Sequence, residues 1–193
     1  MEEKIERVLK KLNEKNSYTK NYKIMFREFN YLGETDLDNR NLLHILTDSK
    51  FEENKCLIAI KILLKVGLNP NNVEKDGKYN FIQNALYSGY SEQFVINILK
   101  EAFKYGLNPN IQDDDKDTIL HTAIYADDYT GGILSIYKLL TKHGFDSTLK
   151  DNDGYTVYDA IISENKHTHY AISEFKEIYL KQLNNNTSLE QKK

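Results

Sequence analysis

The sequence predicts an all-α protein, built as a solenoid of repeated helix pairs, and two landmarks with one spacing carry this prediction. The residues that open a helical pattern lie 38 or 39 positions apart and are Asn41, Tyr79, Thr118 and Thr156. The glycines that close one lie 39 and 38 positions apart and are Gly67, Gly106 and Gly144. A third observation agrees with both, because Gly-Leu-Asn-Pro-Asn occurs at 67–71 and again at 106–110.

The unit from Asp113 to Thr148 shows the local pattern most clearly. Thr118 is suited to begin a helix, because its hydroxyl can accept a hydrogen bond from the free N–H groups of the first turn. Two apolar stripes at helical spacing follow, separated by the glycines at 131–132, and they consist of Leu120, Ala123 and Ile124, then Ile133, Ile136, Leu139 and Leu140. Gly144 is the left-handed residue expected after a helix. The unit is therefore predicted to be two helices joined by a loop.

Taken in order, the chain divides into three parts. Residues 1–34 carry two amphipathic helical patterns, at 2–15 and 18–32. They are predicted to form an N-terminal helical cap or a degenerate repeat, because the end of a solenoid has one face without a neighbour. About four repeats follow over 35–183. The tail at 184–193 is polar and is predicted to be disordered.

One segment links these repeats to a known family. Thr118-Ile119-Leu120-His121-Thr122-Ala123 resembles the Thr-Pro-Leu-His-x-Ala motif of the ankyrin repeat, with Ile119 in place of proline. Looser copies stand at 41–44 and 151–159, and the most degenerate one stands at 79–82. The resemblance covers roughly residues 34 to 180. The period departs from the family, since the ankyrin period is about 33 residues, and the extra length falls between the two helices of each unit.

The resemblance implies a helical solenoid that binds another protein without catalysing a reaction, through its concave face and its hairpin tips. It also implies that the residues between the aspartate of each hairpin and the threonine that follows project from the tips. The partner-binding residues expected there are Lys75, Asp76, Asp114, Asp115, Asp117, Asn152, Asp153 and Tyr155. Tyr125, Asp127 and Tyr129 lie just behind the third tip and complete the expected binding surface.

Charge along these tips turns from basic to acidic, which predicts a partner with a basic surface. Mutual repulsion disfavours three carboxylates at Asp114, Asp115 and Asp117, so the fold alone does not require them, and such a patch speeds the association of a basic partner. Tyrosine is favoured at interfaces, and the chain has 14 tyrosines and no tryptophan. The alternatives are a solvated hairpin tip with aspartate at turn positions and burial of these tyrosines in the core.

Composition argues against several other classes of function. The net charge of −3 lacks the basic footprint of a nucleic-acid-binding protein. No apolar run reaches the length of a membrane span, and the first residues lack the pattern of a signal peptide. The single cysteine, Cys56, excludes an intrachain disulfide and fits a reducing compartment. We expect a cytoplasmic protein that is monomeric when free and needs no cofactor.

The histidines and aspartates leave two alternatives open. His44 and His121 stand at the histidine position of the motif, where the resemblance implies hydrogen bonds to loop backbone rather than catalysis. His167 and His169 form a pair without a third ligand in the sequence. The aspartates at 113–117 lack the glycine and the distal glutamate of an EF-hand loop. The alternatives are a scaffold subunit of a larger assembly and a metal-dependent enzyme that uses these His and Asp groups.

Overall fold

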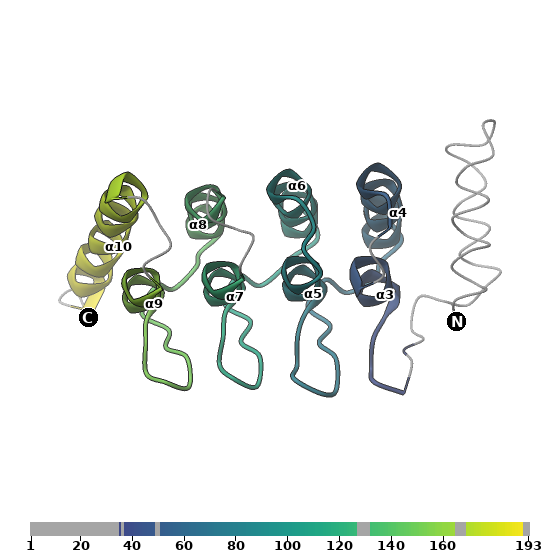
Figure 1. Cartoon of the computed structure of the whole chain (residues 1–193), viewed down its shortest axis with the longest axis horizontal. Helices are drawn as coiled ribbons and strands as arrows, with labels where there is room; N and C mark the ends of the chain where they lie inside the picture. The colour runs from purple at the N-terminus through teal and green to yellow at the C-terminus, as the bar shows by residue number, and fades with distance from the viewer. Residues whose placement is uncertain (1–34, 36, 49–50, 127–131, 165–168, 191–193) are drawn as a thin grey trace.

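Figure 1 shows the computed structural model of the chain, which describes residues 35, 37–48, 51–126, 132–164 and 169–190. Over these residues the structure contains eight α-helices and no strand, so the all-α prediction is confirmed there. The shorter helices, of seven residues each, are α3 (Leu42–Asp48), α5 (Phe81–Tyr87), α7 (Ile119–Tyr125) and α9 (Val157–Ser163). The longer helices are α4 (Glu53–Lys65), α6 (Glu92–Phe103), α8 (Ile133–Lys142) and α10 (His169–Glu190). The predicted cap at 1–34 lies outside the described residues.

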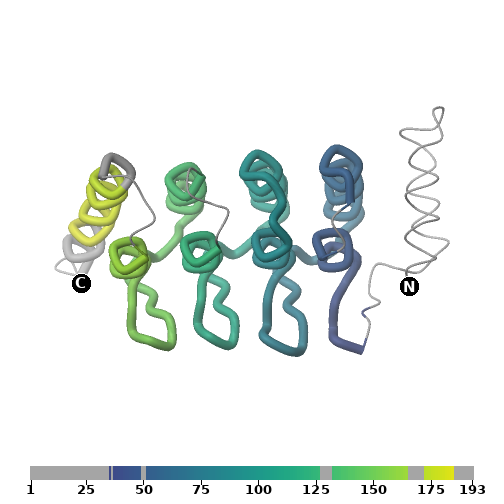
Figure 2. Tube along the Cα trace, viewed as in Figure 1, coloured from purple at the N-terminus to yellow at the C-terminus, as the bar shows by residue number. Residues whose placement is uncertain are grey.

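The helices are arranged in two parallel rows (Figure 2). In the inner row α3 packs on α5, α5 on α7 and α7 on α9, and in the outer row α4 packs on α6, α6 on α8 and α8 on α10. The core fills the space within and between the helix pairs. Leu43, Ile60, Phe81, Leu120 and Leu140 are all fully buried there. The apolar faces expected at Leu120 and Leu140 are therefore placed as predicted.

Irregular segments that we call fingers connect each helix pair to the inner helix of the next, and they project in a row beside the inner helices (Figure 1). Finger 1 covers 37–41, finger 2 covers 73–80, finger 3 covers 112–118 and finger 4 covers 150–156. Single bridges close the base of the last three, and they pair Val73 with Asn80, Gln112 with Thr118, and Lys150 with Thr156. Each of these fingers is thus a minimal hairpin whose ends are held together.

Side-chain caps fix where the inner helices begin. Thr118 accepts a hydrogen bond from the His121 N–H, as predicted, and Thr156 accepts one from Asp159. The prediction that Tyr79 opens the second unit is wrong by one residue, because Asn80 is the N-cap of α5. The reason is that finger 2 holds one more residue than finger 3. In finger 2 the closing hydrogen bond runs from the Glu74 N–H to the Tyr79 carbonyl, whereas in finger 3 it runs from the Asp113 N–H to the Asp117 carbonyl.

The repeated Asn-Pro-Asn segments tie neighbouring units together. The Asn71 Nδ2 donates to the Gly106 carbonyl at 2.8 Å, and its Oδ1 accepts from the Asn108 N–H at 2.7 Å. One unit later Asn110 makes the same two bonds, with the Gly144 carbonyl at 3.1 Å and the Asp146 N–H at 2.8 Å. Gly144 has a φ of 89°, as expected of a left-handed residue that ends a helix. The asparagines therefore satisfy backbone groups that the helix ends leave unpaired.

The C-terminal segment differs from its prediction. Helix α10 continues to Glu190, so residues 184–190 of the predicted disordered tail are helical, and 191–193 lie outside the described residues. Phe175 anchors this helix, since its ring lies 4.2 Å from that of Tyr137 in the core. Once a helix is nucleated, each added residue gains a hydrogen bond at little cost. No helix in the described part of the chain is both long and apolar enough to cross a membrane.

Cys56 lies at the start of α4 and belongs to the core, as its place in an apolar pattern predicts. Its side chain is fully buried, and its thiol lies 3.4 Å from the Leu46 carbonyl, to which it donates. Burial raises the pKa of the Cys56 thiol to about 12. The group is therefore a protonated, inert core side chain rather than a nucleophile.

Replacing Leu120 with alanine tests the assignment of the inner-row core. Because Leu120 is fully buried between adjacent inner helices, Leu120→Ala should lower the free energy of unfolding by about 2–5 kcal/mol. Urea denaturation followed by circular dichroism measures the change. Leu180→Ala is the matched control, since Leu180 is 45% exposed, and it should cost less than about 1 kcal/mol. Equal losses in the two variants would show that the helix faces are assigned wrongly.

Candidate functional site

The four fingers are joined to one another through their backbones. The Lys75 N–H donates to the Asp38 carbonyl at 2.7 Å, the Asp114 N–H to Gly77 at 2.9 Å, and the Asn152 N–H to Asp115 at 2.8 Å. Each bond crosses from one finger to the preceding one. The tips therefore form a continuous, hydrogen-bonded edge, and side chains on that edge are held at fixed spacing.

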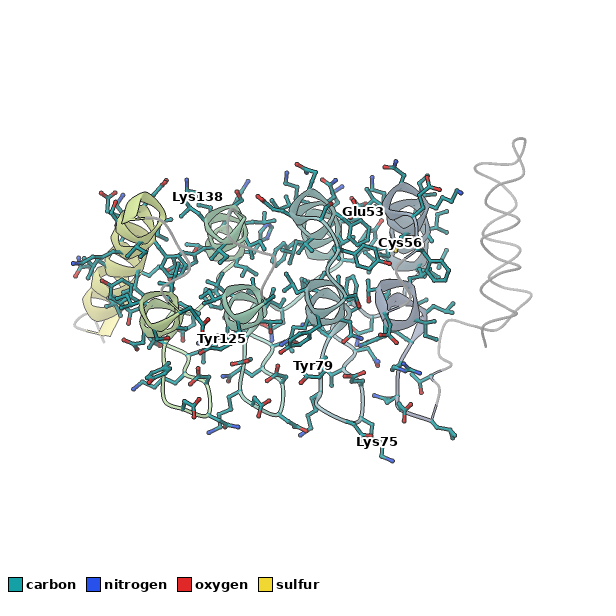
Figure 3. All side chains as sticks on the ribbon, in the orientation of Figure 1. Glu53, Cys56, Lys75, Tyr79, Tyr125 and Lys138 are labelled. Carbon is teal, nitrogen blue, oxygen red and sulfur yellow. The ribbon has the colours of Figure 1, made fainter. Side chains whose placement is uncertain are left out.

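Most of the side chains predicted to project from the tips do so. The exposed ones are Lys75 and Asp76 in finger 2, Asp114 and Asp115 in finger 3, and Asn152, Asp153 and Tyr155 in finger 4. Figure 3 labels Lys75 at the outer edge of the fingers. The Lys78 ammonium forms an ion pair with the Asp114 carboxylate at 2.8 Å, between fingers 2 and 3. This pair neutralises one carboxylate and leaves Asp76, Asp115 and Asp153 as exposed acidic groups of the tips.

Asp117 differs from the prediction in one respect, because it does not project from the tip of finger 3. Its exposed fraction is only 8%, and its backbone explains why. The Asp117 N–H donates to the Asp113 Oδ1 at 2.8 Å, and its carbonyl accepts from the Gln83 Nε2 at 3.1 Å. These bonds turn the residue inward, at the junction of the finger with α7. The sequence could not reveal this, since the partner that holds the carbonyl lies 34 residues earlier.

Two further aspartates are buried and serve as tethers of the fingers. Asp113 Oδ1 accepts from the N–H groups of Asp115 and Asp117, while its Oδ2 accepts from Gln83 at 3.0 Å. Asp151 Oδ1 accepts from the Tyr155 N–H at 2.8 Å. Sequence reasoning did not assign Asp113 and Asp151 this role. Their equivalent places at the start of fingers 3 and 4 were the signal that could have identified it.

Of the tyrosines near the tips, some are bonded within the fold and others are exposed at the surface. Tyr125 is half-buried, and its hydroxyl donates to the Asp151 Oδ2 at 2.6 Å, so it links α7 to finger 4. Figure 3 shows Tyr79 and Tyr125 where the fingers meet the inner helices. Tyr155 and Tyr87 remain 45% and 52% exposed. Asp127 and Tyr129, also predicted for the site, lie outside the described residues.

The burial of Asp117 has an electrostatic consequence. Burial raises the pKa of its carboxyl to about 7, and the negative charges of Asp113, Asp151, Asp115 and Asp153 contribute in the same direction. Burial also raises the pKa of Asp113. Fingers 3 and 4 therefore carry a concentrated negative field, part of it on the surface and part of it just beneath.

The histidines of the repeated motif bond to finger backbone, as expected. His44 Nε2 lies 3.2 Å from the Tyr79 carbonyl, and His121 Nε2 lies 3.2 Å from the Tyr155 carbonyl. Their Nδ1 atoms face the preceding caps, at 2.9 Å from Asn41 Oδ1 and from Thr118 Oγ1. Burial lowers the pKa of His121, which favours the neutral ring. Both nitrogens of each ring are thus engaged in holding a finger to the helix before it.

No group of three or more His, Cys, Asp or Glu side chains has the arrangement of a metal site within the residues that the structure describes. His167 and the side chain of His169 are outside them.

No protein-family model matches the sequence, and a search of curated proteins finds no match.

The ionisation of Asp117 predicts a pH-dependent effect of its removal. In the folded chain this carboxyl holds its proton up to a pKa of about 7, whereas in the unfolded chain it ionises near its ordinary pKa of 3.8. The folded state therefore binds more protons between these pH values, and this group makes stability fall as the pH rises through that window. Asp117→Asn should stabilise the protein more at pH 8 than at pH 4, by on the order of 2–4 kcal/mol.

Urea denaturation at the two pH values measures this difference. Asp153→Asn is the matched control, because the exposed Asp153 carboxylate is solvated in both states, and it should show a much smaller difference. An equal effect of Asp117→Asn at both pH values would contradict the placement of Asp117 as a buried charge.

Proposed function

We propose that this chain is a non-enzymatic protein-binding module, an ankyrin-like repeat stack that acts as an adaptor or inhibitor. The partner lies against the concave side, which the fingers form together with the inner helices, and it contacts the finger tips. The recurring geometry supports the resemblance: equivalent caps open α5, α7 and α9, and His44 and His121 bond finger backbone in the same way. The compartment proposed is the cytoplasm, on the basis of the single buried thiol.

The observation that carries the proposal is the row of exposed side chains on mutually bonded fingers. Asp115 and Asp153 form no ion pair with any residue in the described part of the chain, and the exposed Tyr155 lies in the same finger as Asp153. The fold does not need these side chains, since the bonds that close the fingers come from backbone and from the buried Asp113 and Asp151. Polar and aromatic groups held rigidly at a surface are typical of protein-binding sites.

The distribution of charge favours a partner with a basic surface. Finger 2 presents Lys75 beside Asp76, whereas fingers 3 and 4 present Asp115 and Asp153, together with Lys116, above the buried carboxylates. An acidic patch of this kind attracts a basic partner during diffusional encounter and fixes its orientation. In fingers 3 and 4 the exposed carboxylates that form no ion pair among the described residues are therefore Asp115 and Asp153, while Asp114 is paired with Lys78.

Of the two alternatives, the scaffold subunit has one observation in its favour. Ile162 in α9 and Leu180 in α10 are 48% and 45% exposed, although both are large and apolar. Exposed apolar side chains at the end of a stack suit a permanent neighbour. The metal-dependent enzyme has less support than the scaffold subunit. Both ring nitrogens of His44 and His121 are already bonded within the chain.

Reversing the exposed charges of fingers 3 and 4 tests the proposal. Asp115→Lys combined with Asp153→Lys should slow association with the partner by roughly tenfold at low salt and weaken the dependence of the rate on ionic strength, because electrostatic steering is lost. Affinity capture with mass spectrometry identifies proteins that bind the wild-type chain and not this variant. Association rates are then measured at two ionic strengths.

The matched control carries the same change in net charge on the outer helices, as Glu52→Lys with Glu177→Lys, and both residues are exposed. The control should bind the partner as the wild type does. Equal capture and equal rates for the finger variant and the control would move the binding site away from the fingers.

A further inference from the structure

The position just before the helix cap is occupied by arginine, tyrosine or aspartate, and in two fingers its side chain has a fixed companion. The residues at this position are Arg40, Tyr79, Asp117 and Tyr155. Arg40 reaches Asp48, the last residue of α3, with 3.0 Å between Nη1 and Oδ2. Tyr79 reaches Tyr87, the last residue of α5, with ring centroids 5.1 Å apart. In these units the residue before the cap is matched by the residue that ends the same helix.

Asp117 lacks such a companion. The last residue of its helix is Tyr125, but the Tyr125 hydroxyl is donated to Asp151 at 2.6 Å. Among the described residues, none forms a hydrogen bond or an ion pair with the Asp117 carboxylate, although the residue is only 8% exposed. Both backbone groups of Asp117 are bonded, to Asp113 and to Gln83. The backbone of Asp117 is thus held in place, while its carboxylate has no bonded partner among the described residues and its oxygens are not fully enclosed.

The groups around this carboxylate are acidic or aromatic. Asp113 and Asp115 belong to its own finger, Asp151 and Asp153 to finger 4, and all four disfavour a negative charge at Asp117. Asp117 in turn disfavours ionisation of Tyr87 and Tyr125, so it lies near the ends of both α5 and α7. Crowding of carboxylates is costly, because each negative charge disfavours the ionised form of its neighbours. A cation placed among these groups would remove that cost and gain several favourable interactions at once.

We infer that the partner places an arginine side chain between fingers 3 and 4, with its guanidinium on the carboxylate of Asp117. The inference rests on the proposed function and names the chemistry that the partner must bring. Arginine suits the place better than lysine, because its planar fork of five donors can bond Asp117 and the exposed Asp115 or Asp153 together. Its flat face also stacks on tyrosine, and Tyr87, which is about half-exposed, feels the charge of Asp117.

The first unit of the chain contains the same kind of ion pair with the two charges exchanged. In unit 1 the arginine is part of the protein, since Arg40 stands before the cap and pairs with Asp48 at the end of α3. In the third unit an aspartate stands where Arg40 stands in the first, and no cation of the described part of the chain pairs with it. Within the described residues the pair therefore lacks its basic member, which a binding partner can supply.

The test uses random dodecapeptides displayed on phage and selected on the immobilised full-length chain. The dissociation constants of selected peptides are measured by fluorescence anisotropy for the wild type, for Asp117→Asn and for the finger variant Asp115→Lys with Asp153→Lys. Each arginine of a peptide is also replaced by citrulline, which keeps the shape and removes the charge. Glu177→Gln on α10 is the control, because it removes one exposed carboxylate far from the fingers.

We expect Asp117→Asn to weaken binding by about tenfold or more, as the loss of a charge-assisted hydrogen bond does. Citrulline at one peptide position should have the same effect, and the two changes together should weaken binding no further, because they break one contact. A lysine at that position should restore part of the affinity. Glu177→Gln should change the dissociation constant by less than about twofold. Asp117→Asn should remain folded, since its carboxylate accepts no hydrogen bond from the described residues, and circular dichroism checks this.

The other outcomes separate the two proposals. Peptides that bind the fingers, and so respond to the finger variant, but are unaffected by Asp117→Asn would overturn the arginine contact and leave the binding surface in place. Peptides without a sensitive arginine would do the same. Peptides that respond to neither variant, or the failure to select any peptide, would overturn the proposed function and the inference with it.

Discussion

The structure depends on satisfying backbone groups where one helix pair meets the next. Short helices leave free N–H and carbonyl groups at both ends, and the irregular segments between them add more. Asn71 and Asn110 bond these groups across two successive joints. The finger-to-finger bonds of Lys75, Asp114 and Asn152 do the same on the opposite side of the stack. The near-constant spacing of the repeats is consistent with these bonds, which fix how each unit packs on the next, while the extra residue of finger 2 is accommodated within that finger.

The same bonds that stabilise the fingers also prepare them for binding. A loop that must be ordered when a partner arrives loses conformational entropy at that moment, and affinity falls accordingly. Here the buried carboxylates of Asp113 and Asp151 have already fixed the backbone of fingers 3 and 4. Exposed residues such as Asp115 and Asp153 are therefore held in a fixed arrangement before the partner binds. Ordering their backbone then costs no further conformational entropy.

Variation at one repeated position separates structural needs from functional ones. The residue before each cap keeps the same backbone role, while its side chain is Arg40, Tyr79, Asp117 or Tyr155. Arg40 and Tyr79 improve the local packing of their own units. Asp117 does the opposite, because its burial among carboxylates opposes its ionisation. A residue that weakens its own fold in a defined place is a reasonable sign of a function carried there.

The sequence by itself determined the local elements: the helical stripes, the cap at Thr118, the left-handed Gly144 and the burial of Leu120 all follow from neighbours within one or two turns. It also predicted that Asp115 and Asp153 are exposed, since turn tips face water. Only the tertiary structure decided that Asn80 caps α5, that α10 runs to Glu190, and that Asp117 is buried while Tyr125 bonds Asp151. These outcomes depend on partners such as Gln83, 34 residues from Asp117, or Asp151, 26 residues from Tyr125. Local patterns cannot contain such contacts, because stacking alone brings those residues together.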